Sequence, residues 1–202
     1  MKDINENSLL FIYEGETEAE FYKKFFNNHV PERKIRRNYG NLKGVYNINK
    51  KVNSKIESYL LDNKWHSCNS IHVFVAYDRE GPRDTESLFN IELARNKFIS
   101  KSSRIKSINE IIATQDLESW FFHDIDGIYK FLKVPKSKRN YSAYVNVEAT
   151  DNRILSALFH RYNKHYQKGK RVEGFLNSLD LLKISRKVKE LQDSLTIINK
   201  LI

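Results

Sequence analysis

The stretch LLFIYEGETEAEFY, residues 9–22, decides the fold. Its first five residues, Leu9 to Tyr13, are apolar without interruption, as is typical of a strand buried on both faces, and Glu14-Gly15 ends the run. Thr17 and Glu20 then fit a capping box at the start of a helix. Aromatic residues follow at helical spacing, namely Phe21, Tyr22, Phe25 and Phe26. The stretch therefore predicts a strand followed by a helix that packs on the sheet.

The same order recurs along the chain. A second strand signal, residues 71–77, is apolar apart from His72 and ends at Asp78-Arg79-Glu80, and a further strand is expected over 108–114, before Gln115-Asp116-Leu117-Glu118. A weaker strand signal covers 41–48, and helical patterns cover 52–61 and the segment from Asp84 or Thr85 to about Phe98. Strands that alternate with helices predict an α/β fold with a mainly parallel sheet flanked by helices.

Carboxylates follow three of these strands. In a parallel sheet the carboxyl ends of the strands lie along one edge, so Glu14, the Asp78/Glu80 pair and the Asp116/Glu118 pair are expected to converge there. Clustered carboxylates resist ionisation unless a cation lies between them, and oxygen ligands suit Mg²⁺ or Mn²⁺. The alternative is that each acid caps or begins a helix, and Glu16, Glu18 and Glu20 are assigned mostly to that role.

Residues 12–22 resemble the hydrophobic-Glu-Gly-x-x-Glu opening of the Toprim fold, most closely the version in OLD-family nucleases and small Toprim-like proteins of bacterial defence systems. By this resemblance, which covers about Leu9 to Trp120, Glu14 corresponds to the family's glutamate after the first strand. Asp78-Arg79-Glu80 is similar to its Asp-x-Asp, with Glu in place of the second Asp. Glu118 falls in a segment similar to a Glu-x-Trp of the small proteins.

The resemblance implies metal-dependent phosphodiester hydrolysis of DNA or RNA, with Glu14, Asp78, Glu80 and Glu118 as metal ligands and catalytic residues. Lys168 and Lys170 stand where related proteins place a lysine that contacts phosphate, so Lys168 joins the catalytic set. Because no Walker A motif occurs, a separate ATPase or sensor protein is an expected partner, in anti-phage defence. The alternatives are a noncatalytic nucleic-acid or protein-binding module, and an RNA-processing enzyme similar to Toprim ribosomal-RNA maturases.

The charge is divided unevenly along the 202 residues, whose formal net charge is +10. Residues 133–202 carry fifteen Lys/Arg against six Asp/Glu, while residues 1–132 are nearly neutral. Such asymmetry favours a polyanionic partner. Candidate nucleic-acid contacts are Lys43, within a second basic cluster from Lys23 to Lys55, and Lys168, Lys170 and Arg171. Tyr141, Tyr144, Tyr162 and Tyr166 interleave with basic residues in a pattern suited to base stacking.

The pattern after Leu132 is helical, which predicts a Toprim-like catalytic domain over 1–132 and a basic helical extension over 133–202 that packs on it. Ile184, Val188, Leu191, Leu195, Ile198 and Ile202 form a heptad-like seam. The seam covers fewer than three heptads, so it predicts either packing on the domain or a homodimer through the C-terminal helix.

Several classes are excluded or disfavoured. The composition, 40% hydrophobic and 30% charged, excludes a largely disordered chain. One cysteine, no signal-peptide pattern and no apolar run near 18 residues predict a cytoplasmic protein without a membrane partner. The six histidines form no zinc motif, and no Gly-x-Ser-x-Gly elbow occurs.

Overall fold

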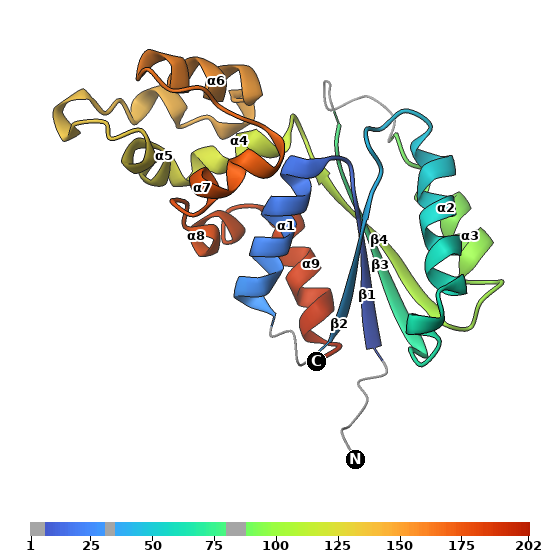
Figure 1. Cartoon of the computed structure of the whole chain (residues 1–202). Coiled ribbons are helices and arrows are strands. Elements are labelled where there is room, and N and C mark those ends of the chain that lie inside the picture. Colours follow the sequence, from blue (N-terminus) through green and yellow to red (C-terminus); the bar gives the residue numbers. More distant parts are fainter. Residues whose placement is uncertain (1–6, 31–34, 80–87) are drawn as a thin grey trace.

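The computed structural model describes residues 7–30, 35–79 and 88–202, and its centre is a four-stranded parallel sheet. The strands are β1 (Asn7–Tyr13), β2 (Arg36–Asn41), β3 (Ser70–Asp78) and β4 (Ile105–Ala113), in the order β2-β1-β3-β4. Every neighbouring pair is parallel. The predicted α/β class with a parallel sheet is therefore confirmed, and all four strands end at the same edge (Figure 1).

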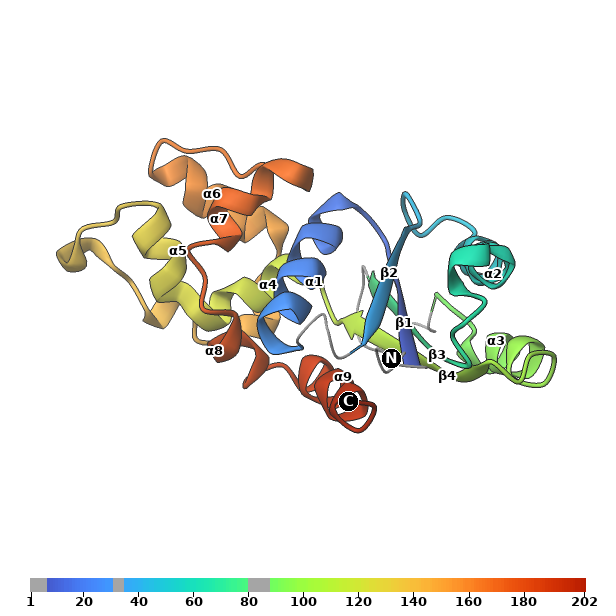
Figure 2. The same ribbon diagram turned by 60° about the horizontal axis from the view of Figure 1, so that its bottom comes forward.

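Helices cover both faces of the sheet. The helices α1 (Glu16–His29) and α9 (Lys189–Asn199) lie on one face, and α2 (Ile48–Leu61) and α3 (Ile91–Phe98) lie on the other (Figures 1 and 2). Alternate residues of β1 explain this arrangement. Leu9 and Phe11 belong to the hydrophobic cluster under α1 and α9, whereas Leu10 and Ile12 belong to the cluster under α2 and α3. The uninterrupted apolar run in β1 is thus a consequence of burial on both faces.

The rest of the chain is a group of short helices that follows β4. They are α4 (Leu117–Phe121), α5 (Ile125–Phe131), α6 (Asn152–Arg161), α7 (Glu173–Leu176) and α8 (Leu181–Ser185). Single 3-10 turns connect several of them, at Phe122–Asp124, Lys136–Lys138, Ser142–Tyr144, Val147–Ala149 and Gly169–Val172; another, at Asn63–Trp65, follows α2. Their apolar faces join the cluster under α1, so one core includes side chains from β1 and from α6 to α9.

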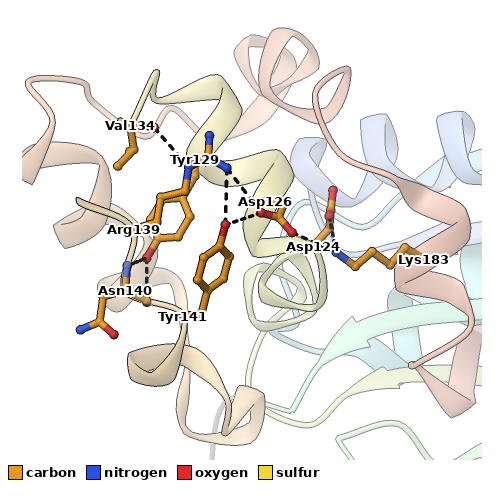
Figure 3. A network of polar contacts seen from close by, with 8 residues as sticks. All are labelled: Asp124, Asp126, Tyr129, Val134, Arg139, Asn140, Tyr141 and Lys183. Atoms are coloured by element: carbon orange, nitrogen blue, oxygen red, sulfur yellow. Dashed lines mark hydrogen bonds and ion pairs between the residues drawn. The ribbon is translucent and has the colours of Figure 1, made fainter. Parts of the chain in front are cut away.

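Polar contacts hold the helical part together (Figure 3). The buried Asp124 accepts hydrogen bonds from the backbone N–H of Asp180, at 2.8 Å, and from Lys183 Nζ, at 2.9 Å. Tyr129 donates its hydroxyl to the carbonyl of Asn140 and accepts from the N–H of the same residue. The bonds of Asp124 join the start of α5 to α8. The bonds of Tyr129 join α5 to the loop at 139–141.

Several predicted boundaries are wrong. The strand expected at 41–48 lies at Arg36–Asn41, because an edge strand with polar residues lacks the apolar pattern of the central strands. The helix expected from 52 begins at Ile48, and the strand expected from 108 begins at Ile105. The helix expected from Asp84 or Thr85 is described from Ile91 only, and residues 84–87 lie outside the described residues.

The start of α1 also differs from prediction. Gly15 is its N-cap and makes no side-chain cap hydrogen bond, while the hydroxyl of Thr17 accepts a hydrogen bond from the N–H of Gly169. The capping box of Thr17 and Glu20 is therefore absent, and Thr17 connects two distant segments instead.

The heptad-like seam packs inside the molecule. Ile184, Val188, Leu191 and Ile198 are buried in the cluster under α1, and Leu195 packs against it, while Ile202 is 42% exposed. No described helix is both long enough and apolar enough to cross a membrane.

Candidate active site

Two carboxylates meet where the central strands end. Glu14 follows β1 directly and Asp78 is the last residue of β3, the strand next to it. The backbone N–H of Asp78 donates to Glu14 Oε2 at 3.2 Å. Asp78 Oδ1 accepts from the N–H of Leu117 at 3.0 Å, which joins the end of β3 to the start of α4. The parallel topology thus brings together acids that are 64 residues apart.

The two acids after β4 have different positions. Asp116 is the N-cap of α4 and accepts hydrogen bonds from the N–H groups of Ser119 and Asn152, at 3.0 and 2.7 Å. Glu118 is wholly buried, and its Oε1 accepts from the Tyr166 hydroxyl at 2.9 Å. Both contacts of Asp116 are therefore to backbone N–H groups, whereas Glu118 contacts the side chain of Tyr166, 48 residues away.

Lys168 supplies a cation next to Glu118. Its Nζ lies 3.3 Å from Glu118 Oε1, and about half of its side chain, 54%, is exposed. Gly169 follows with a φ of +74° and donates its N–H to Thr17 Oγ1 at 2.8 Å. A Cβ at Gly169 would lie 2.9 Å from Glu16 Oε2, so glycine suits both the backbone conformation and the close contact with α1.

An open pocket of about 430 Å³ lies at this edge of the sheet. Its lining combines the end of β1, the first turn of α1, the end of β3 and the segment before the 3-10 turn at Gly169–Val172. The lining residues are Glu14, Gly15, Glu16, Thr17, Glu18, Asp78, Lys168 and Gly169.

Burial and mutual repulsion act on the acids of this pocket. Burial, together with the charges of Glu118 and Glu14, raises the pKa of Glu18 from 4.5 to about 7. Burial, followed by the charges of Glu18, Glu14 and Glu118, raises the pKa of Asp78 well above its ordinary value. Partial burial lowers the pKa of Lys168, but the charge and hydrogen bond of Glu118, with the charges of Glu18 and Asp78, together raise that pKa overall. The pocket therefore concentrates more negative charge than one lysine neutralises.

The donor atoms suit a hard divalent cation. All are carboxylate oxygens, and Glu118 Oε2 is buried with no hydrogen-bond partner among the described residues. Across residues 7–30, 35–79 and 88–202, no three His, Cys, Asp or Glu side chains are arranged around a single point as an ion cage. Mg²⁺ does not require such a cage, since it commonly binds through one or two carboxylates and keeps several waters.

The other predicted site residues lie at different distances from the pocket. Glu80 lies outside the described residues. Lys43 is exposed on the loop after β2, next to Gly44, whose N–H donates to the carbonyl of Glu14 at 3.0 Å. Lys170 and Arg171 are exposed on the 3-10 turn at Gly169–Val172 and are not among the lining residues of the pocket.

Two residues of the site were assigned other roles from the sequence. Glu18, interpreted as a capping residue, is only 7% exposed and lines the pocket. Its spacing of four residues from Glu14 was the available signal. Tyr166, interpreted as a base-stacking residue, donates to Glu118. No local pattern indicates that contact, because 48 residues separate the two.

Comparisons with known proteins place the chain in a family. Two structures of the C-terminal region of the OLD protein of Xanthomonas campestris pv. campestris are similar to it, at TM-scores of 0.42 and 0.45 and 12% identity, covering 95% of this chain and 97% of theirs. That degree of similarity adds nothing to the assignment of the site. No curated protein matches the chain. The profile of a domain of unknown function, DUF4276, matches residues 13–198, from the last residue of β1 to the last turn of α9. The chain therefore belongs to the DUF4276 family.

Proposed function

We propose that this chain is a Mg²⁺- or Mn²⁺-dependent nuclease that hydrolyses phosphodiester bonds of DNA or RNA. The observation that carries the proposal is the meeting of Glu14, Glu18 and Asp78 beside Lys168 in one open pocket. Acids this close to one another need protons or a cation, and a pocket with access from solvent offers room for both a cation and a substrate. The resemblance of residues 12–22 to the Toprim opening supports the same chemistry.

The proposed roles follow from the contacts. Glu14, Glu18 and Asp78 would hold the cation, with Glu118 and Glu80 as further proposed ligands. A bound divalent cation supplies a water of lowered pKa and neutralises charge on the leaving oxygen. Lys168 stays protonated because Glu118 raises its pKa, and its exposed Nζ would donate hydrogen bonds to a phosphate oxygen as negative charge develops there.

Tyr166 and Glu118 would orient the cation or the attacking water. The Tyr166 hydroxyl occupies Glu118 Oε1, which leaves Oε2 for a cation or for the attacking water. Tyr166 and Glu118 come from the helical part of the chain, as does Lys168, which lines the pocket, so that part contributes to the site rather than only covering the sheet.

Partners are also part of the proposal. Lys43, Lys170 and Arg171 are exposed and would contact nucleic acid outside the pocket. A separate ATPase or sensor protein would regulate activity, in anti-phage defence. A homodimer through the C-terminal helix would use the exposed face of α9, because Leu191 and Ile198 are buried within the chain.

A noncatalytic binding module is the second proposed function. It is favoured by one observation, that no three potential ligands in the described ranges surround a common point. In that case the acids would bind or exclude a partner without turnover. A ribosomal-RNA-processing enzyme is a special case of the first proposal and is distinguished by its substrate.

The deciding experiment measures cation binding and cleavage on the same proteins. Wild type, Asp78→Asn, Lys168→Gln and Asp62→Asn are titrated with Mg²⁺ and with Mn²⁺ by calorimetry. They are then incubated with either cation and plasmid DNA, single-stranded DNA, transfer RNA or ribosomal RNA. Asn at position 78 keeps an oxygen that accepts from the N–H of Leu117. Asp62, which caps the 3-10 turn at Asn63–Trp65 after α2, is the matched control.

We expect wild type and Asp62→Asn to bind Mg²⁺ and to cleave one class of nucleic acid, and Asp78→Asn to do neither. Lys168→Gln should bind Mg²⁺ but cleave about 100- to 1,000-fold more slowly. Mg²⁺ binding without cleavage of any substrate supports the noncatalytic module. Absence of Mg²⁺ and Mn²⁺ binding to wild type contradicts the metal site.

A further inference from the structure

The loop between β2 and α2, residues 42–47, lies directly beside the pocket. Backbone N–H groups of Leu42 and Gly44 donate to the carbonyls of Tyr13 and Glu14, at 2.9 and 3.0 Å. Figure 1 shows this loop at the same end of the sheet as the start of α1. Any strand of nucleic acid bound across the pocket toward α2 would therefore run over this loop.

The loop is held in one conformation. Lys51 Nζ donates to the carbonyls of Lys43 and Gly44, at 3.2 and 3.0 Å, and Asn41 Oδ1 accepts from the N–H of Lys43 at 2.7 Å. Lys43, Gly44 and Asn47 have positive φ values of 55°, 94° and 55°. Lysine at such a φ is strained relative to glycine or asparagine, so the surrounding hydrogen bonds keep this conformation in place.

The loop presents an aromatic ring to solvent. Tyr46 is 80% exposed, the largest exposed fraction among the large hydrophobic side chains of the described ranges. The ring contributes almost nothing to the core, yet the loop that carries it is fixed by hydrogen bonds to its backbone.

Positive charge surrounds Tyr46. From Ile35 to Ile56 the chain has six Lys or Arg residues and no Asp or Glu. Of these, Lys43 and Lys50 lie within four residues of Tyr46 and are exposed. An exposed ring between lysines is the combination by which proteins bind unpaired nucleic acid, since the ring stacks on a base and the lysines contact the flanking phosphates.

We propose that Tyr46 stacks on an unpaired base of the nucleic acid that enters the pocket, with Lys43 and Lys50 on the phosphates beside that base. A base in a duplex has both faces covered by its neighbours, so a ring that uses its own face selects single strands, frayed ends or flipped bases. The substrate class is therefore unpaired DNA or RNA. That this strand is then cut rests on the proposed function, whereas the stacking rests on the loop alone.

The test is a binding measurement without turnover. Fluorescence anisotropy is recorded in EDTA with labelled single-stranded DNA, single-stranded RNA of the same sequence, and the matching duplex DNA. The variants are Tyr46→Ala, Tyr46→Trp and Lys43→Gln. The matched controls are Leu61→Ala, since Leu61 is 78% exposed at the far end of α2, and Lys64→Gln, since Lys64 is exposed after that helix.

We expect Tyr46→Ala to weaken single-strand binding about 5- to 150-fold, the range for loss of one base–aromatic stack, and Tyr46→Trp to restore it. Duplex binding should change less than about 2-fold in Tyr46→Ala, while Lys43→Gln should weaken single-strand binding and reduce its salt dependence. Comparison of the DNA and RNA single strands identifies which of the two the loop prefers.

Equal binding by wild type and Tyr46→Ala overturns the proposal, and so does equal weakening on single strand and duplex. The proposal is also overturned if Leu61→Ala or Lys64→Gln weakens single-strand binding as much as the loop variants do. The binding measurement is made in EDTA, so its result does not depend on whether the protein cleaves nucleic acid. Single-strand binding through Tyr46 by a protein that cuts nothing would contradict the proposed nuclease while supporting the stacking.

Discussion

Replacing Glu18 with Gln should stabilise the metal-free protein at pH 8 and leave it unchanged at pH 4.5. In the folded protein the pKa of Glu18 is about 7 against an ordinary value of 4.5. Its protonated form is therefore favoured by folding. The associated stability is complete below pH 4.5, decreases as the pH rises through 7, and is lost above that value.

The magnitude follows from those two pKa values. Each pKa unit corresponds to about 1.4 kcal/mol, so ionised Glu18 lowers the free energy of unfolding by about 3 kcal/mol at pH 8. For a chain of this length, that is about 6 to 12 °C in Tm. Glutamine keeps an oxygen for the hydrogen bond that the Glu18 carboxylate accepts from its own backbone, but it adds no charge to the cluster.

The assay is thermal unfolding followed by circular dichroism, in EDTA, from pH 4.5 to pH 8 at constant ionic strength. The matched control is Glu20→Gln, on the same helix, since Glu20 lies outside the pocket and pairs with Lys23 at 3.9 Å. Addition of Mg²⁺ at pH 8 should raise the Tm of wild type more than that of Glu18→Gln, because the cation then offsets the same charge.

A Tm difference between Glu18→Gln and wild type that stays constant from pH 4.5 to pH 8 would refute the reasoning. A variant less stable than wild type at pH 8 would do the same. An equal pH response in Glu20→Gln would show that the effect does not come from the pocket.

Three further substitutions test contacts at Glu118, in the helical part and in the core under α1. Tyr166→Phe removes the hydrogen bond to Glu118, and urea unfolding should show a loss of about 1.5 to 3 kcal/mol; no change would show that the bond does not form. Gly127→Ala places a Cβ 2.7 Å from the carbonyl oxygen of Ser178, so differential scanning calorimetry should show a lower Tm, and an unchanged Tm would contradict the close approach. Phe21→Ala empties a wholly buried site on α1 and should cost about 3 to 5 kcal/mol in guanidinium unfolding, whereas a loss below about 1 kcal/mol would contradict its burial.

The central strands could be predicted because strands buried on both faces of a sheet have nearly continuous apolar sequences. Leu9 to Tyr13 is apolar throughout, Ile71 to Tyr77 is apolar apart from His72, and both runs form strands within one residue or two of the expected bounds. Parallel pairing then places Glu14 and Asp78 at one edge whatever the details of the helices. The edge strand β2 lacks an apolar run, since five of its six residues are at least partly exposed.

The rest of the site depends on contacts between distant segments. Glu18 has the sequence context of a first-turn helix residue, and only its burial near Glu118, Glu14 and Asp78 distinguishes it from one. The contact of Tyr166 with Glu118 is created by the packing of the helical part, which no local periodicity encodes. The charge count identifies residues 133–202 as basic, but it does not distinguish Lys168, which lines the pocket, from Lys170, which does not.

The core under α1 has a consequence for how the chain folds. Leu9 of β1 and Ile198 of α9 belong to the same cluster, and Asn7 Nδ2 donates to the carbonyl of Leu201 at 2.9 Å across 194 residues. On that face of the sheet, α1 alone cannot complete the core, which therefore stays incomplete until the segment that forms α9 has been synthesised. Contacts of such long sequence separation slow folding, and they expose apolar strands to aggregation in the meantime. We therefore expect chains shortened before Lys189 to fail to fold, rather than to lose a peripheral helix.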